Sequence, residues 1–210
     1  MSRDGHGFSS GEAVAYDARS FGFYGDVRTG KTTAALAEAQ AEAGAAGLPL
    51  LIIDSLGSST FDHLRNQYEV KSARAACLRV WESGRHALFM PSDPEEVEAI
   101  AKVAFLRGHK GKSCVILIDE TSPWFSAMYR PRELTLLLRA HRHCYVSLFL
   151  TTQYLGDLSP AYLQCVENHR IFRNSSPRAL VRIKETFPTI DVGKVQTLPL
   201  GAHFDYPPEA

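Results

Sequence analysis

The sequence predicts an α/β fold in which a mostly parallel central sheet is covered by helices on both faces. Apolar runs alternate along the chain with segments that favour helix, the order expected of parallel strands joined by crossover helices. The apolar runs are continuous, as in strands that are buried on both faces. Polar residues follow several runs, at the carboxyl ends where such sheets bind ligands. With 210 residues, 45% of them hydrophobic, the chain suits one domain with a large core.

A glycine-rich loop joins the first predicted strand, at 21–24, to the first predicted helix, at 33–46. The loop reads GDVRTGKTT and fits the pattern G-x-x-x-x-G-K-[ST]. Between a strand and a helix, its N–H groups point at a phosphate chain and the helix adds its positive end. We expect Lys31 to reach the terminal phosphates and Thr32 to bind Mg²⁺. The expected nucleotide contacts are Gly25, Asp26, Val27, Arg28, Thr29, Gly30, Lys31, Thr32 and Thr33.

The remaining elements follow from the same patterns. Further strands are expected at 49–54, 76–81, 86–90, 114–120, 144–150 and 169–172. Further helices are expected at 61–72, at 92–107, at 132–139, and after Ser159-Pro160 and Ser176-Pro177. Ser92-Asp93-Pro94 offers a cap and a first-turn proline, and two acids follow it near the positive helix end. The tail after 187 carries four prolines and is expected to be extended.

Two acids end the predicted strand at 114–120, which reads CVILIDE. Asp119 is expected to hold the shell of Mg²⁺, and Glu120 to polarise an attacking water. The same residues would also suit a strand that runs into a solvated turn, but their position after a complete glycine loop favours a nucleotide site. Gln153 ends the next buried strand and can hydrogen-bond both water and phosphate, with an ordinary strand-end amide as the alternative. Asp54 ends a third strand.

The composition argues against a strongly basic nucleic-acid-binding protein. With 23 basic and 23 acidic residues, any DNA contact must come from local patches. The cysteines, at 77, 114, 144 and 165, form no C-x-x-C pair, which favours a reduced, intracellular setting. His141, His143 and Cys144 could begin a metal site, but the lack of a matching spacing elsewhere favours crowded helix-end residues. No apolar stretch of about 20 residues could span a membrane, and the first residues lack a signal-peptide core.

Three arginines are candidates for the chemistry of phosphate. Arg139 and Arg142 lie between a predicted helix and a buried strand. An arginine supplied by a neighbouring subunit can raise the rate of phosphoryl transfer by about 10³–10⁵, although most arginines are only solvated. Arg28 lies inside the glycine loop, where it could touch a phosphate of its own subunit or point outward to a subunit interface. Both roles of Arg28 stay open.

Taken together, these segments resemble the FtsK–HerA superfamily of DNA-pumping P-loop ATPases. The resemblance rests on GDVRTGKT and CVILIDE as Walker A and Walker B motifs, and on PLLIID, LLLRAHRHCYVSLFLTTQ and HRIFRN. Within the superfamily the chain is most similar to the genome-packaging ATPases of membrane-containing viruses with double-stranded DNA. The similar region runs from about Phe21 to Phe204. Arg28 and Thr29 depart from the small residues common before the glycine-lysine pair.

The resemblance implies one RecA-like ATPase domain at 19–206, between a flexible lead-in at 1–18 and a tail at 207–210. It also implies ATP and Mg²⁺ as cofactors, and a homo-oligomeric ring, a hexamer or pentamer, around double-stranded DNA. Thr32 and Asp119 would be the metal ligands. Glu120, Lys31, Gln153 and Arg142 would be catalytic, with Arg142 serving the neighbour's ATP and Arg139 as second choice. Further expectations are a viral procapsid vertex as partner, location in the host cytoplasm, and association with the virion.

Other functions stay open beside the packaging motor. They are a cellular or plasmid FtsK/HerA-like DNA translocase, a P-loop phosphotransferase, and a non-catalytic, nucleotide-dependent assembly protein. The length leaves no room for the extra domains of cellular relatives, which favours the viral motor. Candidate DNA contacts are 108–113, with Lys110 and Lys112, and 121–132, with Arg130 and Arg132.

Overall fold

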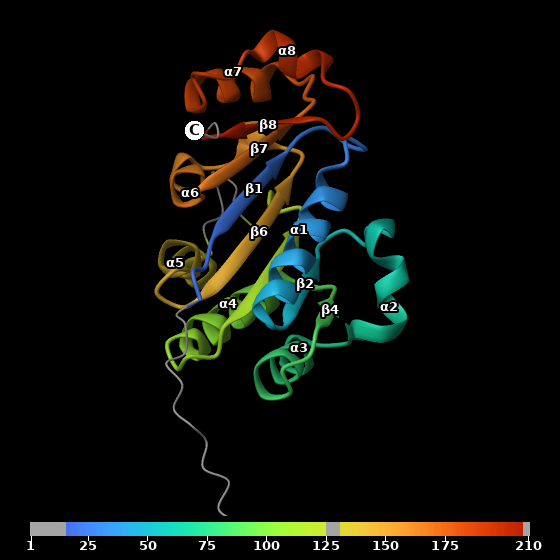
Figure 1. The fold of residues 1–210 in the computed structure, drawn as a ribbon, viewed down its shortest axis with the longest axis vertical. Coiled ribbons are helices and arrows are strands. Elements are labelled where there is room, and N and C mark those ends of the chain that lie inside the picture. Colours follow the sequence, from blue (N-terminus) through green and yellow to red (C-terminus); the bar gives the residue numbers. More distant parts are fainter. Residues whose placement is uncertain (1–15, 125–130, 208–210) are drawn as a thin grey trace, which may run out of the picture.

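The computed structural model describes residues 16–124 and 131–207, which fold around one eight-stranded sheet (Figure 1). The strands are β1 (Ser20–Tyr24), β2 (Leu50–Asp54), β3 (Glu69–Val70), β4 (Ala87–Phe89), β5 (Cys114–Asp119), β6 (Val146–Thr152), β7 (Asn168–Phe172) and β8 (His203–Tyr206). Their spatial order is β3-β4-β2-β5-β6-β1-β7-β8. Every neighbouring pair is parallel except β7 and β8. The expected, mostly parallel sheet is therefore confirmed.

Helices connect these strands. In the part of the chain that the structure describes, they are α1 (Lys31–Ala46), α2 (Asp62–Tyr68), α3 (Ala73–Cys77), α4 (Pro94–Gly108), α5 (Arg132–Ala140), α6 (Pro160–Cys165), α7 (Pro177–Thr186) and α8 (Val192–Thr197). Short 3-10 turns lie at Ser59–Phe61 and Leu155–Asp157, and a π-helical turn lies at Leu78–Glu82.

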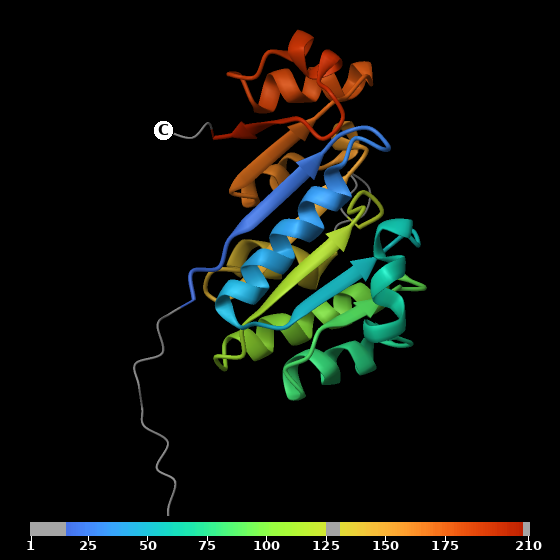
Figure 2. The ribbon, with the colours of Figure 1, turned by 45° about the vertical axis from the view of Figure 1, so that its right-hand side comes forward.

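The helices cover both faces of the sheet, as expected. On one face, α1 and α2 pack on alternate strand residues such as Val115 and Leu117 (Figure 2). On the other, α3 to α8 pack on the residues between them, such as Ile116 and Ile118. Both sets are completely buried, because a parallel sheet with helices on both sides exposes neither face. This arrangement explains why the strand sequences show continuous apolar runs.

The sheet register brings the polar residues of the predicted site together at the carboxyl ends of the strands. Asp54 pairs with Asp119 across β2 and β5, and Tyr24 pairs with Thr152 across β1 and β6. Since these four strands are parallel, their carboxyl ends, and the loops that follow them, lie together. The glycine loop, the two acids at the end of β5 and Gln153 therefore lie together at the carboxyl ends of the strands.

The start of α4 shows how the local sequence determines a boundary. The Asp93 side chain accepts a hydrogen bond from the Glu96 N–H at 3.0 Å, and the Glu96 carboxylate accepts one from the Ser92 N–H at 2.8 Å. This reciprocal pair satisfies N–H groups that the first helical turn leaves open. Pro94 occupies the first turn, where no N–H is needed. The predicted helix start is confirmed.

Several predicted elements were wrong. The strand expected at 76–81 is helical instead, in α3 and the following π turn. Its buried residues, Ala76, Val80 and Trp81, are spaced as on one face of a helix. A run this short does not distinguish strand from helix by periodicity. The predicted helix at 61–72 ends at Tyr68, and the strand predicted from 144 begins at Val146.

The tail is also more ordered than expected. Asp191 caps α8 by accepting hydrogen bonds from the N–H groups of Gly193 and Lys194, and β8 then pairs with β7. Of the lead-in expected at 1–18, residues 1–15 lie outside the described residues. Its described part includes Tyr16, whose hydroxyl lies 2.6 Å from Ser147 Oγ. Residues 208–210 also lie outside the described part of the chain.

Candidate nucleotide site

The glycine loop is tied to the strands on either side of β1. The Gly25 N–H donates to the Thr152 carbonyl at 3.3 Å, and the Asp26 N–H to the Arg173 carbonyl at 2.9 Å. A β-carbon on Gly25 would lie 2.7 Å from Phe172 Cβ, so the loop needs glycine there to pass so close to β7. Gly30 precedes α1 with φ +94°, a backbone region that suits glycine.

Lys31 begins α1 and lies almost fully buried behind the loop. Its Nζ donates to the Asp26 carbonyl at 3.3 Å. Burial lowers the pKa of Lys31, while the carboxylates of Glu120, Asp119 and Asp26 oppose that change. A cation held this way can move to a phosphate without leaving the loop.

Thr32, in the first turn of α1, contacts Asp119, the last residue of β5. The Thr32 hydroxyl donates to Asp119 Oδ1 at 2.8 Å, and the Thr151 hydroxyl donates to the same oxygen at 2.7 Å. Burial raises the pKa of Asp119, and the two hydroxyls oppose the rise. A hydroxyl beside a carboxylate is a set of hard oxygen donors that fits Mg²⁺, which takes few protein ligands and completes its shell with water and phosphate. These two residues would hold the ion.

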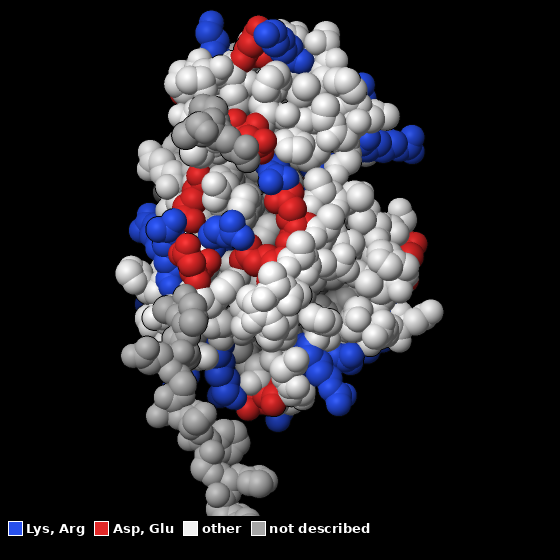
Figure 3. All heavy atoms as spheres, viewed as in Figure 1, with Lys and Arg blue, Asp and Glu red and all other residues white. Residues whose placement is uncertain are grey.

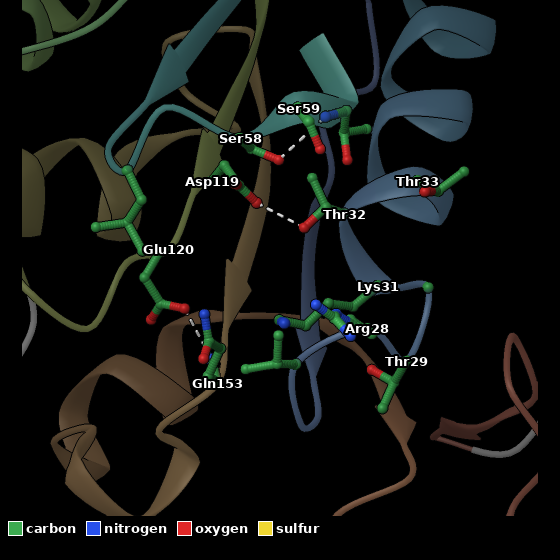
Figure 4. Close-up of a pocket in the computed structure, with 14 residues that line it drawn as sticks. Arg28, Thr29, Lys31, Thr32, Thr33, Ser58, Ser59, Asp119, Glu120 and Gln153 are labelled. Atoms are coloured by element: carbon green, nitrogen blue, oxygen red, sulfur yellow. Dashed lines mark hydrogen bonds between the residues drawn. The ribbon is translucent and has the colours of Figure 1, made fainter. Parts of the chain in front are cut away.

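Glu120 follows β5 and lies beside Gln153, which follows β6 (Figure 4). Its Oε1 accepts hydrogen bonds from the hydroxyls of Ser122 at 2.6 Å and Thr152 at 2.8 Å, and its Oε2 accepts one from the Gln153 N–H at 3.0 Å. Glu120 is only 2% exposed and has φ +58°, a left-handed conformation uncommon for a glutamate. The carboxylate of the predicted base therefore contacts the main chain of the predicted phosphate sensor.

These residues surround a cavity of about 370 Å³. Its lining contains Lys31, Thr32, Asp119, Glu120 and Gln153, together with loop residues from Val27 to Thr33. Gly25 and Asp26 support the loop from behind. The structure thus brings together the residues predicted for nucleotide, metal and base, but not Arg142.

The cavity's opposite wall, Ser58 to Thr60, was not predicted from the sequence. This wall is positioned by Asp54, which is completely buried and accepts hydrogen bonds from the Ser58 N–H at 2.9 Å and the Arg65 guanidinium at 2.6 Å. Asp54 therefore shapes the site without lining it. Thr151 and Thr152, which hold the two acids, were also missed. A polar pair at the end of a buried strand was the available signal.

Arg139 and Arg142 lie toward the amino ends of the strands, because they precede β6, whereas the cavity lies beyond its carboxyl end. Arg142 is 60% exposed and forms an ion pair with Glu167. Lys110 and Lys112 precede β5 and so also lie near the amino ends of the strands, where Lys112 pairs with Glu82. Arg132 follows β5 on the cavity side and is 91% exposed. Arg130, the remaining DNA candidate, lies outside the described residues.

The surface seen in Figure 3 carries basic residues in small groups beside acidic ones. This pattern agrees with the equal numbers of basic and acidic residues in the chain. Within residues 16–124 and 131–207, no helix combines the length and apolar character needed to cross a bilayer. The same residues contain no group of three or more His, Cys, Asp or Glu side chains suited to a metal ion.

Solved structures share this fold. The genome-packaging NTPase B204 from Sulfolobus turreted icosahedral virus 2, in complex with AMP, is 19% identical over 90% of this chain and 92% of that chain, with a TM-score of 0.74. The DNA-packaging ATPase B204 from Sulfolobus turreted icosahedral virus is 20% identical over 90% and 93%, also with a TM-score of 0.74. EssC (ATPases 2 and 3) from Geobacillus thermodenitrificans is 16% identical over 90% and 37%, with a TM-score of 0.57.

No protein-family model and no curated protein matches the sequence. At the identities above, structural similarity establishes the fold. The expected RecA-like P-loop fold is therefore confirmed. The structures that share the fold include genome-packaging ATPases, the proteins that the motifs resemble.

Proposed function

We propose that this protein is an ATP-hydrolysing motor that translocates double-stranded DNA and packages a viral genome into a procapsid. One observation carries the proposal. Lys31, the Thr32–Asp119 pair and the Glu120–Gln153 pair come from three separate segments and converge on one cavity. A phosphate-binding loop alone would bind nucleotide, whereas a carboxylate placed across the cavity from it can activate water.

In the proposed reaction, N–H groups of the loop from Val27 to Thr33 and the Lys31 ammonium bind the phosphates of ATP. Mg²⁺, held by Thr32 and Asp119, would supply positive charge to the terminal phosphates. Glu120 accepts a proton from the water that attacks the γ-phosphorus, and the bond to the β–γ bridging oxygen breaks, which leaves ADP and phosphate. Gln153 lines the cavity, where its side-chain amide can hydrogen-bond the water and the phosphate, while its main-chain N–H holds Glu120.

Similar proteins support the nucleotide and the cargo. The B204 structures include complexes with ATP-gammaS and AMPPCP, and B204 is described as a genome-packaging NTPase. For this chain we propose a domain at 19–206 that binds ATP and forms a homo-oligomeric ring, a hexamer or pentamer. The ring would surround double-stranded DNA at a procapsid vertex in the host cytoplasm. Balanced charge implies that the DNA is held by several weak local contacts.

The test is the rate of phosphate release from ATP by the purified protein, with and without double-stranded DNA. We expect release without an added acceptor, stimulation by DNA, and loss of both in Lys31→Ala. Transfer only to an added nucleoside would indicate a phosphotransferase, and negligible hydrolysis that ignores DNA would indicate an assembly protein. Packaging is distinguished from cellular translocation by DNA that becomes nuclease-resistant when procapsids, the protein and ATP are mixed.

A further inference from the structure

Arg28 adopts a backbone conformation that its side chain disfavours. It lies between Gly25 and Gly30 with φ +62°, a region that glycine enters without steric cost. Among the described residues, the non-glycine residues with positive φ are Arg28, Glu120 and Tyr145, and the first two line the same cavity. Such strained residues cluster at functional sites, where the surrounding structure holds them in place. The conformation therefore points to a use for the Arg28 side chain.

The Arg28 guanidinium is an uncommitted cation at the cavity. Arg28 is exposed and lines the cavity on the same side as Lys31, across from Glu120 and Gln153 (Figure 4). Within the part of the chain that the structure describes, it has no hydrogen bond or ion pair. The carboxylates of Asp119 and Glu120 face the same space but are already held by hydroxyl and N–H donors. An arginine in this position has its donors free for a ligand.

The ligand chemistry follows from the guanidinium. Its planar donors match the oxygens of a phosphate and can bind two of them at once, which an ammonium does not do with fixed geometry. Lys31, beside it, keeps its Nζ within reach of the Asp26 carbonyl. Two cations on one side of the cavity favour the more highly charged nucleotide, which is the triphosphate.

We propose that Arg28 binds the terminal phosphate of ATP within its own subunit, so that the site prefers ATP over ADP. This inference rests on the nucleotide site of the proposed function and assigns a role that the sequence left open. The alternative role, contact with a neighbouring subunit, would make the nucleotide preference of an isolated subunit independent of Arg28.

The test compares Mg²⁺-ATP and Mg²⁺-ADP affinities of isolated wild-type and variant subunits, using a non-hydrolysable ATP analogue. Arg28→Ala keeps the strained backbone and loses the charge, whereas Arg28→Gly loses both. Both variants are expected to reduce the preference for triphosphate by about 10- to 100-fold, the loss of a charge-assisted hydrogen bond. Arg28→Lys should retain part of the preference. Arg28→Gly should melt at least as high as Arg28→Ala, because its backbone is relaxed.

Tyr145→Gly is the matched control for backbone strain, because Tyr145 also has positive φ but lies before β6, away from the cavity. It should leave the ratio of affinities unchanged. An unchanged ratio in Arg28→Ala would overturn the inference and leave the proposed ATPase intact. Equal loss of ATP and ADP affinity would overturn it too, since Arg28 would then support the loop as a whole. Wild-type protein that binds neither nucleotide would overturn both the inference and the proposed function.

Discussion

Glu120 is anchored by its neighbours to a degree that suits a base whose position matters. Its side chain accepts hydrogen bonds from Ser122, Thr152 and Gln153, and its own N–H donates to the Thr151 hydroxyl at 2.9 Å. Carboxylates that accept several hydrogen bonds are oriented as well as stabilised. Three of these partners, Thr151, Thr152 and Gln153, lie at the end of β6, so the end of this strand fixes the position of the proposed base.

Replacing Glu120 by glutamine should separate binding from hydrolysis. The amide keeps the size of the side chain but accepts no proton, so we expect ATP to stay bound while turnover falls by about 10²–10⁴-fold. Single-turnover hydrolysis and nucleotide affinity, measured on the same preparation, check this. Ser122→Ala is the control, because it removes one donor and leaves the carboxylate with two others. Wild-type turnover in Glu120→Gln would remove Glu120 from the catalytic assignment.

At the scale of elements, β7 carries a buried titratable group that contacts β1. His169 on β7 lies 3.0 Å, at Nδ1, from the hydroxyl of Tyr24, the last residue of β1. Burial lowers the pKa of His169 to about 4 from an ordinary 6.5. Between these values the unfolded chain binds more protons at this histidine than the folded chain does. The stabilisation is therefore complete above pH 6.5 and is lost as pH falls toward 4.

His169→Gln should flatten the pH dependence of stability in that window. The wild-type free energy of unfolding is expected to drop by up to about 3 kcal/mol between pH 6.5 and 4 from this group alone. The variant will be less stable at neutral pH, because it loses ring packing against Phe187. The decisive quantity is thus the slope of unfolding free energy against pH, measured by urea titration. The same slope in both proteins would place the acid sensitivity elsewhere.

The sequence predicted the elements that a strong local pattern defines. The runs at β2, β5 and β6 are rich in β-branched and aromatic residues, which favours a buried strand, and the glycine loop has a spacing that little else requires. The segment 76–81 failed because tertiary packing decides whether so short an apolar run coils or extends. Ser58 to Thr60 could not be found, since that wall is set by the ion pair of Asp54 with Arg65, a contact made in three dimensions.

For the whole molecule, the placement of Arg142 limits what it can do. The seven residues of β6 separate it from Gln153, a span of roughly 20 Å. Arg142 therefore cannot serve the cavity of its own subunit, and a catalytic role requires a neighbouring copy. The Arg142 side chain pairs with Glu167 and lies near the surface, at the amino ends of the strands.

Arg142→Ala should lower turnover in the assembled protein by about 10³–10⁵-fold while nucleotide affinity stays close to wild type. Mixing Arg142→Ala with Glu120→Gln subunits should restore some activity, because a mixed interface can pair an intact Glu120 with an intact Arg142. Arg139→Ala removes the second candidate from the same segment, and a larger loss of turnover there would assign the role to Arg139. Absence of rescue in rings shown to contain both variants would contradict a role in the neighbour's site.

DNA binding is the last property that belongs to the whole molecule. The described residues of the two candidate segments lie at opposite ends of the strands. Arg132 follows the strand that carries the two acids, is 91% exposed, and forms a long ion pair with Glu133 at 3.8 Å. Lys112 lies near the amino ends of the strands and is already paired with Glu82 and with the Trp81 carbonyl. A lysine held in this way gains less from a DNA phosphate than an arginine whose ion pair is long and exposed to solvent.

Arg132→Ala should therefore weaken binding to double-stranded DNA equally for all sequences, and reduce the salt dependence by about one unit of slope for each phosphate that is no longer neutralised. The Lys110→Ala, Lys112→Ala double variant should change both quantities less. Binding should need the assembled protein, because linked weak contacts gain strength from effective concentration. The measurement is DNA affinity across a salt series, in protein whose assembly has been verified. If the salt dependence falls in the lysine double variant and not in Arg132→Ala, the DNA lies at the amino ends of the strands, away from the nucleotide.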